Sequence, residues 1–148
     1  MKKLPKGIND FRELRKWNCV YVDKTEYIYK MVEDNKYIFI SRPRRFGKSL
    51  TVSVLEYLFR GEKELFKDTW IYDKWNWESY PVVRLDINKI STKTPERFEN
   101  SLHEEIISIA KSYEIVLERT NYDDKFYELI EKLSEKYDKP VVLSLIHI

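Results

Sequence analysis

Three consecutive residues, Gly47, Lys48 and Ser49, have the types that are needed to bind a polyphosphate. A glycine lets backbone amides turn toward an anion, a lysine ammonium reaches the terminal phosphates, and a serine hydroxyl holds magnesium at a helix start. The tripeptide ends a loop at residues 41–49, between an apolar run typical of a buried strand and an apolar run typical of a helix. This context predicts a phosphate-binding loop whose ligands are a polyphosphate and Mg²⁺.

The loop differs from the usual phosphate-binding loop at its start. The full motif has a glycine five positions before Gly47, where this chain has Arg42. Pro43 also removes one amide that would otherwise donate to phosphate. Because Gly-Lys-Ser alone is a weak signal, a basic surface loop that contains it by chance is the alternative interpretation. Arg44 and Arg45 fit both interpretations, as phosphate ligands or as solvated side chains.

The residues expected to contact the nucleotide continue from the loop into the helix. Lys48 is the candidate catalytic residue, and Ser49 is the candidate magnesium ligand. Asp86, at the end of a second apolar strand, is a weaker candidate for magnesium; the alternative is that it caps the loop after that strand. The expected nucleotide-binding set is Arg44, Arg45, Phe46, Gly47, Lys48, Ser49 and Leu50.

Two segments before the loop are also candidates for a place near the nucleotide. Asp23-Lys24-Thr25 closely precedes the first expected strand, and a helix N-cap with solvated neighbours explains this triplet equally well. Phe11 and Tyr21 are candidates for an adenine pocket, although core packing is the stronger interpretation of both rings.

Hydrophobic periodicity predicts alternating helices and strands. Asp10 is expected to cap a helix at 11–16, and Asp23 to begin a second helix that ends near Asn35. Strands joined by crossover helices predict parallel pairing in an α/β fold. The further expected elements are a strand at 37–40, a helix at 50–59, a strand at 82–87, a helix that begins at Ser91 or Thr94 and runs to about 113, a helix at about 122–137 and a strand at 141–143.

Composition limits the class of protein. The 148 residues suffice for one domain, and 27 basic against 25 acidic side chains give a net charge of 27 − 25 = +2, which excludes a polycationic tail. The one cysteine, Cys19, cannot form an internal disulfide, which fits a cytoplasmic protein. No apolar run approaches the roughly 18 residues of a membrane span, and no apolar stretch follows the N-terminal lysines, so neither a membrane anchor nor a signal peptide is expected.

Three segments stand out together in this order: Gly-Ile-Asn-Asp-Phe at 7–11, Tyr-Val-Asp-Lys-Thr at 21–25 and Ser-Arg-Pro-Arg-Arg-Phe-Gly-Lys-Ser at 41–49. Together they resemble the AAA-ATPase-like family, whose members are commonly fused at the C-terminus to a PD-(D/E)XK nuclease-like domain. The resemblance runs from about Leu4 to Leu143. It implies that the arginine-rich loop is this family's own form of the Walker A loop.

The resemblance further implies a P-loop NTPase three-layer sandwich with a parallel sheet, of which this chain holds the N-terminal half. Residues 1–36 are then a helical segment before the P-loop strand, and 37–143 a partial ATPase core. In the family the last strand continues into an Asp-Glu pair that holds magnesium and polarises the attacking water. Here Leu143 is followed by Ser-Leu-Ile-His-Ile, which looks like translated sequencing-adapter bases, so 144–148 are expected to be a non-native tail.

The leading prediction is an ATP-binding module, deficient in hydrolysis, that lacks the C-terminal half with the nuclease-like domain and has no direct contact with nucleic acid. A second interpretation is that the fragment has no function alone, because its thin sheet has an open edge. A third is a nucleic-acid-binding module that uses the basic residues 42–48 and nearby aromatic rings. Those rings are Trp70, Tyr72, Trp75, Trp77 and Tyr80.

Overall fold

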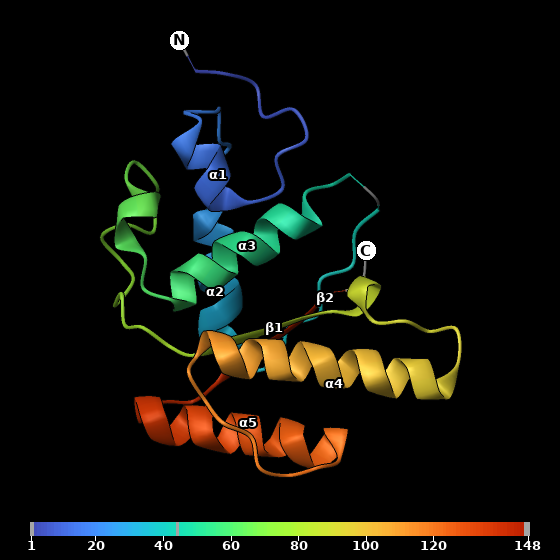
Figure 1. Ribbon diagram of the computed structural model, residues 1–148. Coiled ribbons are helices and arrows are strands. Elements are labelled where there is room, and N and C mark those ends of the chain that lie inside the picture. The colour runs from blue at the N-terminus through green and yellow to red at the C-terminus, as the bar shows by residue number, and fades with distance from the viewer. Residues whose placement is uncertain (1, 44, 147–148) are drawn as a thin grey trace. The chain divides into compact units, whose positions relative to one another are not determined.

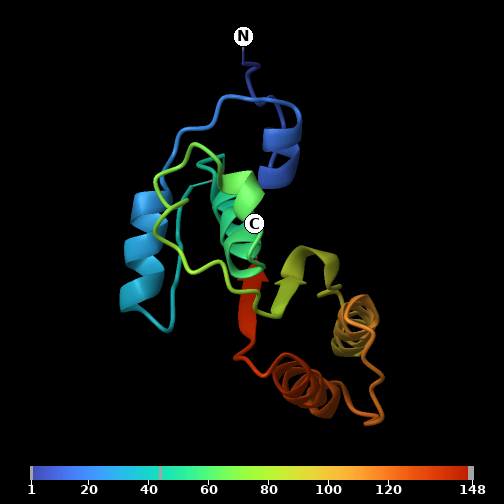
Figure 2. The same cartoon turned by 90° about the vertical axis from the view of Figure 1, so that its left-hand side faces the viewer.

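A computed structural model describes residues 2–43 and 45–146 of the chain. The chain divides into two compact units, Met1–Ser79 and Tyr80–Ile148 (Figures 1 and 2). The sequence predicted boundaries near residues 36 and 143 from motifs, whereas this boundary follows from packing. The predicted domain organisation stays a prediction. No helix within the described ranges is long and apolar enough to cross a membrane.

Short helices make up the first unit. They are α1 (Phe11–Lys16), α2 (Thr25–Asp34), α3 (Lys48–Phe59) and the 3₁₀ turn η1 (Lys63–Phe66). The expected cap of α1 is confirmed, because the Asp10 carboxylate accepts from the third amide of the helix. The helix expected to begin at residue 50 begins two residues earlier, which brings the Lys-Ser pair into its first turn.

The core of the first unit forms where α1, α2 and α3 meet around a set of buried aromatic and aliphatic side chains. The aromatic rings of the segment after η1 pack against this core, so they serve as its cover, and a base-stacking role receives no support. The buried members are Phe11, Ile28, Val54, Tyr57, Leu58, Phe66 and Ile71, and the covering rings include Trp70, Tyr72, Trp75 and Trp77.

A glycine ends α3 where the chain turns back toward this cover. Gly61 has φ = +72°, a left-handed conformation that costs glycine little, and the next amide, of Glu62, donates to the Tyr57 carbonyl over 3.1 Å. A Cβ at this position would lie only 2.7 Å from the carbonyl oxygen of Trp77. No larger residue fits here without movement of the backbone.

The prediction of a buried strand at 37–40 is wrong for this structure. The segment adopts no strand, and its aromatic side chains are almost fully exposed, 86% for Tyr37 and 92% for Phe39. An apolar, β-rich run becomes a strand only when another strand satisfies its amides and carbonyls. The described part of the first unit holds no strand beyond the isolated bridge between Lys3 and Cys19, so this run has no neighbour to pair with.

The second unit holds the sheet. Its elements are β1 (Val82–Asp86), the 3₁₀ turn η2 (Ile87–Lys89), α4 (Pro95–Ser112), α5 (Tyr122–Tyr137) and β2 (Val142–Ile146). The two strands pair in parallel, as the crossover rule predicts, since both helices lie between them in sequence. The unit is therefore α/β, although a two-stranded sheet does not establish the three-layer sandwich.

The helices α4 and α5 lie side by side and cover the sheet (Figure 1). Lys125, near the start of α5, contacts His103 in the middle of α4, and Lys136, near the end of α5, donates to the Tyr113 carbonyl at the end of α4. The two helices are therefore parallel. Thr94 caps α4, with a proline in its first turn as expected. The shared core consists of Val83, Leu85, Ile106, Ala110, Leu129 and Leu133.

The last described residues belong to β2. Ser144 and Leu145 pair in register with Arg84 and Leu85, and Ile146 is buried. This pairing says nothing about the origin of these residues, so the non-native tail stays a prediction. His147 and Ile148 lie outside the described residues.

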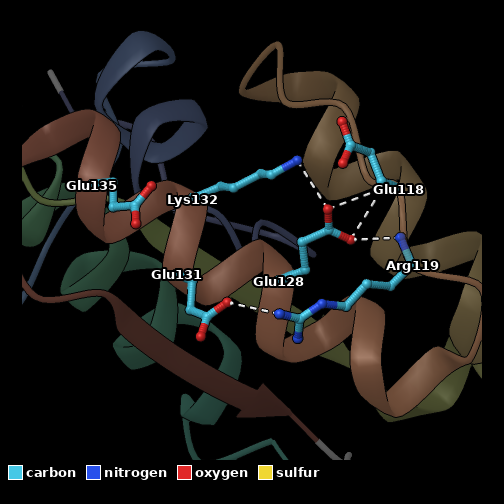
Figure 3. Close-up of a pocket in the computed structure, with 6 residues that line it drawn as sticks. All are labelled: Glu118, Arg119, Glu128, Glu131, Lys132 and Glu135. Atoms are coloured by element: carbon cyan, nitrogen blue, oxygen red, sulfur yellow. Dashed lines mark hydrogen bonds and ion pairs between the residues drawn. The ribbon is translucent and has the colours of Figure 1, made fainter.

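A buried carboxylate holds the connection between α4 and α5. Glu128 accepts from the amides of Glu118 and Arg119 at 2.9–3.0 Å and pairs with Lys132 at 2.9 Å (Figure 3). The lysine bond, followed by the two amide bonds, lowers the pKa of Glu128 to about 2. The Glu128 carboxylate thus satisfies the amides of Glu118 and Arg119 in the loop between α4 and α5.

We predict that Glu128→Gln destabilises the chain in a pH-dependent way. Because the folded pKa lies below the ordinary value of 4.5, the carboxylate stabilises the fold above about pH 4.5 and loses this effect as pH falls toward 2. Urea unfolding followed by circular dichroism should show a gap between wild type and variant at pH 7 that closes on acidification. Glu131→Gln, at an exposed carboxylate, is the control; a gap independent of pH contradicts the assignment.

We also predict that two phenylalanines respond oppositely to truncation. Phe66→Ala removes a fully buried ring and should cost about 3–5 kcal/mol of unfolding free energy. Phe39→Ala removes an exposed ring and should stay within about 0.5 kcal/mol of wild type. Thermal and urea unfolding measure both. A large loss for Phe39→Ala would show that the segment at 37–40 is buried in solution.

Candidate functional site

The loop at 41–47, which the sequence predicts to bind phosphate, passes into α3 at a glycine in the left-handed conformation. Gly47 is the N-cap of the helix with φ = +75°, and no side chain caps the helix. The first amide with a partner is that of Thr51, which donates to the Gly47 carbonyl over 2.9 Å. Among the described residues, the amides of Lys48, Ser49 and Leu50 meet no acceptor. Three donors at a helix start, with no acidic residue in the first turn, favour an anion.

The loop before this glycine is turned by a second left-handed residue. Arg45 has φ = +68°, which a non-glycine residue adopts at a cost, and its side chain is exposed. The Arg42 guanidinium donates to the Phe46 carbonyl over 3.5 Å and so closes the loop on itself. Arg44 lies outside the described residues, so its expected phosphate contact stays a prediction.

The expected nucleotide-binding residues take different places at this helix start. Lys48 and Ser49 are half-buried in the first turn, and the Ser49 hydroxyl has no hydrogen-bond partner within the described ranges. Phe46 is exposed, whereas Leu50 packs against the core. The first turn of α3 therefore carries Lys48, Ser49 and three amides that have no acceptor within 2–43 and 45–146.

Helix α1 holds α3 from its flank. The Phe11 amide donates to the Ser53 hydroxyl over 2.8 Å, and the Tyr57 hydroxyl donates to the Asp10 carboxylate over 2.8 Å. Burial and then this hydrogen bond raise the pKa of Tyr57 to about 12, so the phenol stays protonated and remains a donor. Two residues of the sequence motif at 7–11, Asp10 and Phe11, thus hold the helix that follows the loop.

The triplet Asp23-Lys24-Thr25 has a structural role at two of its three positions. Asp23 accepts from the Thr25 amide over 2.9 Å and from the Trp70 amide over 2.6 Å. The buried Thr25 hydroxyl accepts from the Ile71 amide over 3.2 Å. These bonds attach the start of α2 to the aromatic segment and leave the Lys24 side chain exposed between them.

A cavity of about 220 Å³ adjoins the loop at 41–49. Its walls are mainly apolar and come from the N-terminal segment, α1, the segment before α2, α2, the loop and α3. Tyr21 lines it, whereas Phe11 is fully buried and contacts Tyr21 in a tilted arrangement with 4.9 Å between ring centroids. Burial raises the pKa of Tyr21 to about 12, so its phenol stays protonated, and Lys24 and Arg42 are the charged side chains of the lining. The lining residues are Pro5, Leu14, Val20, Tyr21, Val22, Lys24, Ile28, Arg42, Phe46, Gly47, Leu50, Thr51 and Val54.

Asp86 lies at the end of β1 and caps the turn that follows. Its carboxylate accepts from the Asn88 amide over 3.0 Å and from the Asn88 side chain over 2.9 Å. This contact is the capping alternative expected from the sequence, and a role in binding magnesium stays a prediction. Within 2–43 and 45–146, no group of three or more histidine, cysteine or acidic side chains is arranged to hold a metal ion.

Comparison with known proteins identifies the family. The family described as Predicted AAA-ATPase matches residues 5–146. The chain belongs to the AAA-ATPase-like family. An uncharacterized protein in the vnfD 5′ region of Azotobacter chroococcum mcd 1 is 32% identical over 157 aligned residues, which cover 97% of this chain and 30% of the relative. No solved structure matches the chain. Because the chain spans under a third of that relative, the activity of a whole family member is a matter for proposal.

The sequence did not single out Val20, Val22 and Ile28 as neighbours of the loop. Apolar residues carry no chemical signature, and only the packing of α2 and the segment before it against the start of α3 brings them to Gly47. The available signals were Tyr21 and Lys24, which belong to the motif at 21–25 and line the same cavity.

We predict that Asp10→Ala destabilises the first unit by about 1–3 kcal/mol, since it removes both the α1 cap and the acceptor of Tyr57. Urea unfolding followed by tryptophan fluorescence measures the loss, because the tryptophans at 70, 75 and 77 pack on this core. Asp34→Ala, at the exposed end of α2, is the control and should change little. Equal effects of the two substitutions contradict this account of how α1 is attached to α3.

Proposed function

We propose that this chain binds ATP with Mg²⁺ at the loop that ends in Gly47-Lys48-Ser49. The observation that carries the proposal is the start of α3, where the first turn holds Lys48, Ser49 and three amides that meet no acceptor among the described residues. The β- and γ-phosphates bind the amides and the Lys48 ammonium, because a helix N-terminus and a nearby cation both favour negative charge. Membership of the AAA-ATPase-like family supports this choice of ligand.

The residues at this position fit a magnesium ion that is held mainly by the nucleotide. Magnesium keeps several waters and takes few protein ligands when phosphates are present. The Ser49 hydroxyl has no partner within the described ranges, so it is available as one ligand, and Asp86 remains the weaker candidate. Bound Mg²⁺ would neutralise charge on the phosphates, while the amides and Lys48 orient them.

We further propose that this chain hydrolyses ATP slowly or not at all. The strand β2 carries no carboxylate, since its residues are Val, Leu, Ser, Leu and Ile. Hydrolysis requires a group that orients and activates the attacking water, and a phosphate-binding loop alone does not supply it. In this proposal the residues described here form a nucleotide-binding site, and β2 supplies no group that activates water.

We predict that Lys48→Ala lowers the affinity for Mg-ATP at least about tenfold, because it removes one charged contact of roughly 1.5–3 kcal/mol. Isothermal titration calorimetry of the purified chain with and without Mg²⁺ measures this. The matched control is Lys30→Ala, at an exposed lysine of α2 that pairs with Glu26. Absence of Mg-ATP binding by the folded wild type, or equal binding by wild type and Lys48→Ala, would overturn the proposed function.

A further inference from the structure

The N-terminal segment of the chain lies beside the end of α1. A parallel bridge pairs Lys3 with Cys19, and the Lys3 carbonyl accepts from the Val20 amide over 2.8 Å. Residues 2–6 and 15–20, which are separate in the sequence, are therefore neighbours on the first unit. We call these two segments together the N-terminal patch.

The N-terminal patch concentrates positive charge. It contains five cationic residues and no acidic one, in a chain whose net charge is only +2. The Arg15 guanidinium donates to the backbone carbonyls of Leu65 and Lys67. The lysines of the patch are exposed, and no carboxylate in the described ranges pairs with them. Such a local excess of charge attracts an anionic partner. The five cationic residues are Lys2, Lys3, Lys6, Arg15 and Lys16.

Large apolar side chains are exposed among these cations. Leu4 is 74% exposed, Trp17 58% and Val20 40%. The Lys3 ammonium lies 6.0 Å from the centre of the Trp17 ring, so a cation and an exposed ring are neighbours. The other three tryptophans of the chain, at 70, 75 and 77, pack against the core of the first unit. Apolar side chains that are grouped on a surface mark a site of interaction.

The residue types of the patch fit a phospholipid surface better than other polyanions. Lysine has an apolar stem and a charged end, tryptophan favours the boundary between water and lipid, and aliphatic side chains favour the acyl region. A single-stranded nucleic acid is bound through several rings on which its bases stack, whereas the patch has one ring. Leu4 and Val20 offer no flat face to a base.

We infer that the N-terminal patch binds the surface of a membrane that contains anionic phospholipids. The lysine ammonium groups bind the headgroup phosphates, while Trp17 and Leu4 enter the layer between the headgroups and the acyl chains. Binding of this kind is peripheral, so it needs no membrane-spanning helix. It uses no residue of the loop at 41–49 and is therefore independent of the proposed function.

Tryptophan fluorescence tests the contact with lipid. Vesicles of equal parts phosphatidylcholine and phosphatidylglycerol should shift the emission of the chain to shorter wavelength, and brominated lipid in them should quench it, because Trp17 moves from water into lipid. Vesicles of phosphatidylcholine alone should do neither. Trp17→Phe should abolish the shift, whereas Trp75→Phe, at a ring that packs on the core, should retain it. No shift in the folded wild type, or a shift that survives in Trp17→Phe, would overturn the inference.

Charge reversal tests the role of the lysines. Lys2→Glu combined with Lys3→Glu should lower the affinity for the anionic vesicles at least about tenfold in a co-sedimentation assay. The control combines Lys93→Glu with Lys111→Glu, which makes the same change of net charge at exposed lysines of the second unit and should have a much smaller effect.

Equal losses in the two double variants would show that net charge and not the patch attracts the vesicles, and would overturn the inference. Equal binding to vesicles with and without phosphatidylglycerol would overturn it as well. An oligothymidylate or a polyglutamate that binds the patch more tightly than the anionic vesicles would identify a different partner and would also contradict it.

Discussion

The uncapped N-terminus of α3 is the constraint on which the first unit depends. No side chain caps this helix, and its first three amides meet no acceptor among the described residues. The helix must therefore be held at other places. The Phe11 amide and the Asp10 carboxylate bond to Ser53 and Tyr57, which lie one to three turns into the helix. This attachment holds α3 without using the amides of its first turn.

The same separation of tasks occurs at the start of α2. Asp23 and Thr25 use their side chains to attach this segment to residues 70 and 71, and the Lys24 side chain between them is exposed. Trp70 and its aromatic neighbours cover the core of the unit, so their packing fixes the backbone on both sides of Lys24. Residues that form one motif in the sequence thus divide into two that attach the segment and one that lines the cavity.

The sheet shows how far a strand depends on its neighbours. The strands β1 and β2 pair because α4 and α5 fold back over them, and Glu128 holds the loop that makes this return. The run at 37–40 has equally strong β-forming residues, yet it stays unpaired and exposed because the described part of its unit holds no strand beside it. Tyr37 and Phe39 are residue types that favour strands, but their side chains are exposed here.

The sequence by itself determined the local features of this protein. Asp10 and Thr94 cap helices because a short polar side chain satisfies amides within its own turn, and Gly47 supplies the left-handed turn because glycine adopts it at little cost. The helix at 122–137 follows from its periodicity alone. Only the tertiary structure decided whether 37–40 forms a strand, which members of 23–25 face the cavity, and which apolar residues line it. These outcomes depend on groups that are distant in the sequence, such as the amides of Trp70 and Ile71. A local sequence pattern does not predict where such distant groups lie.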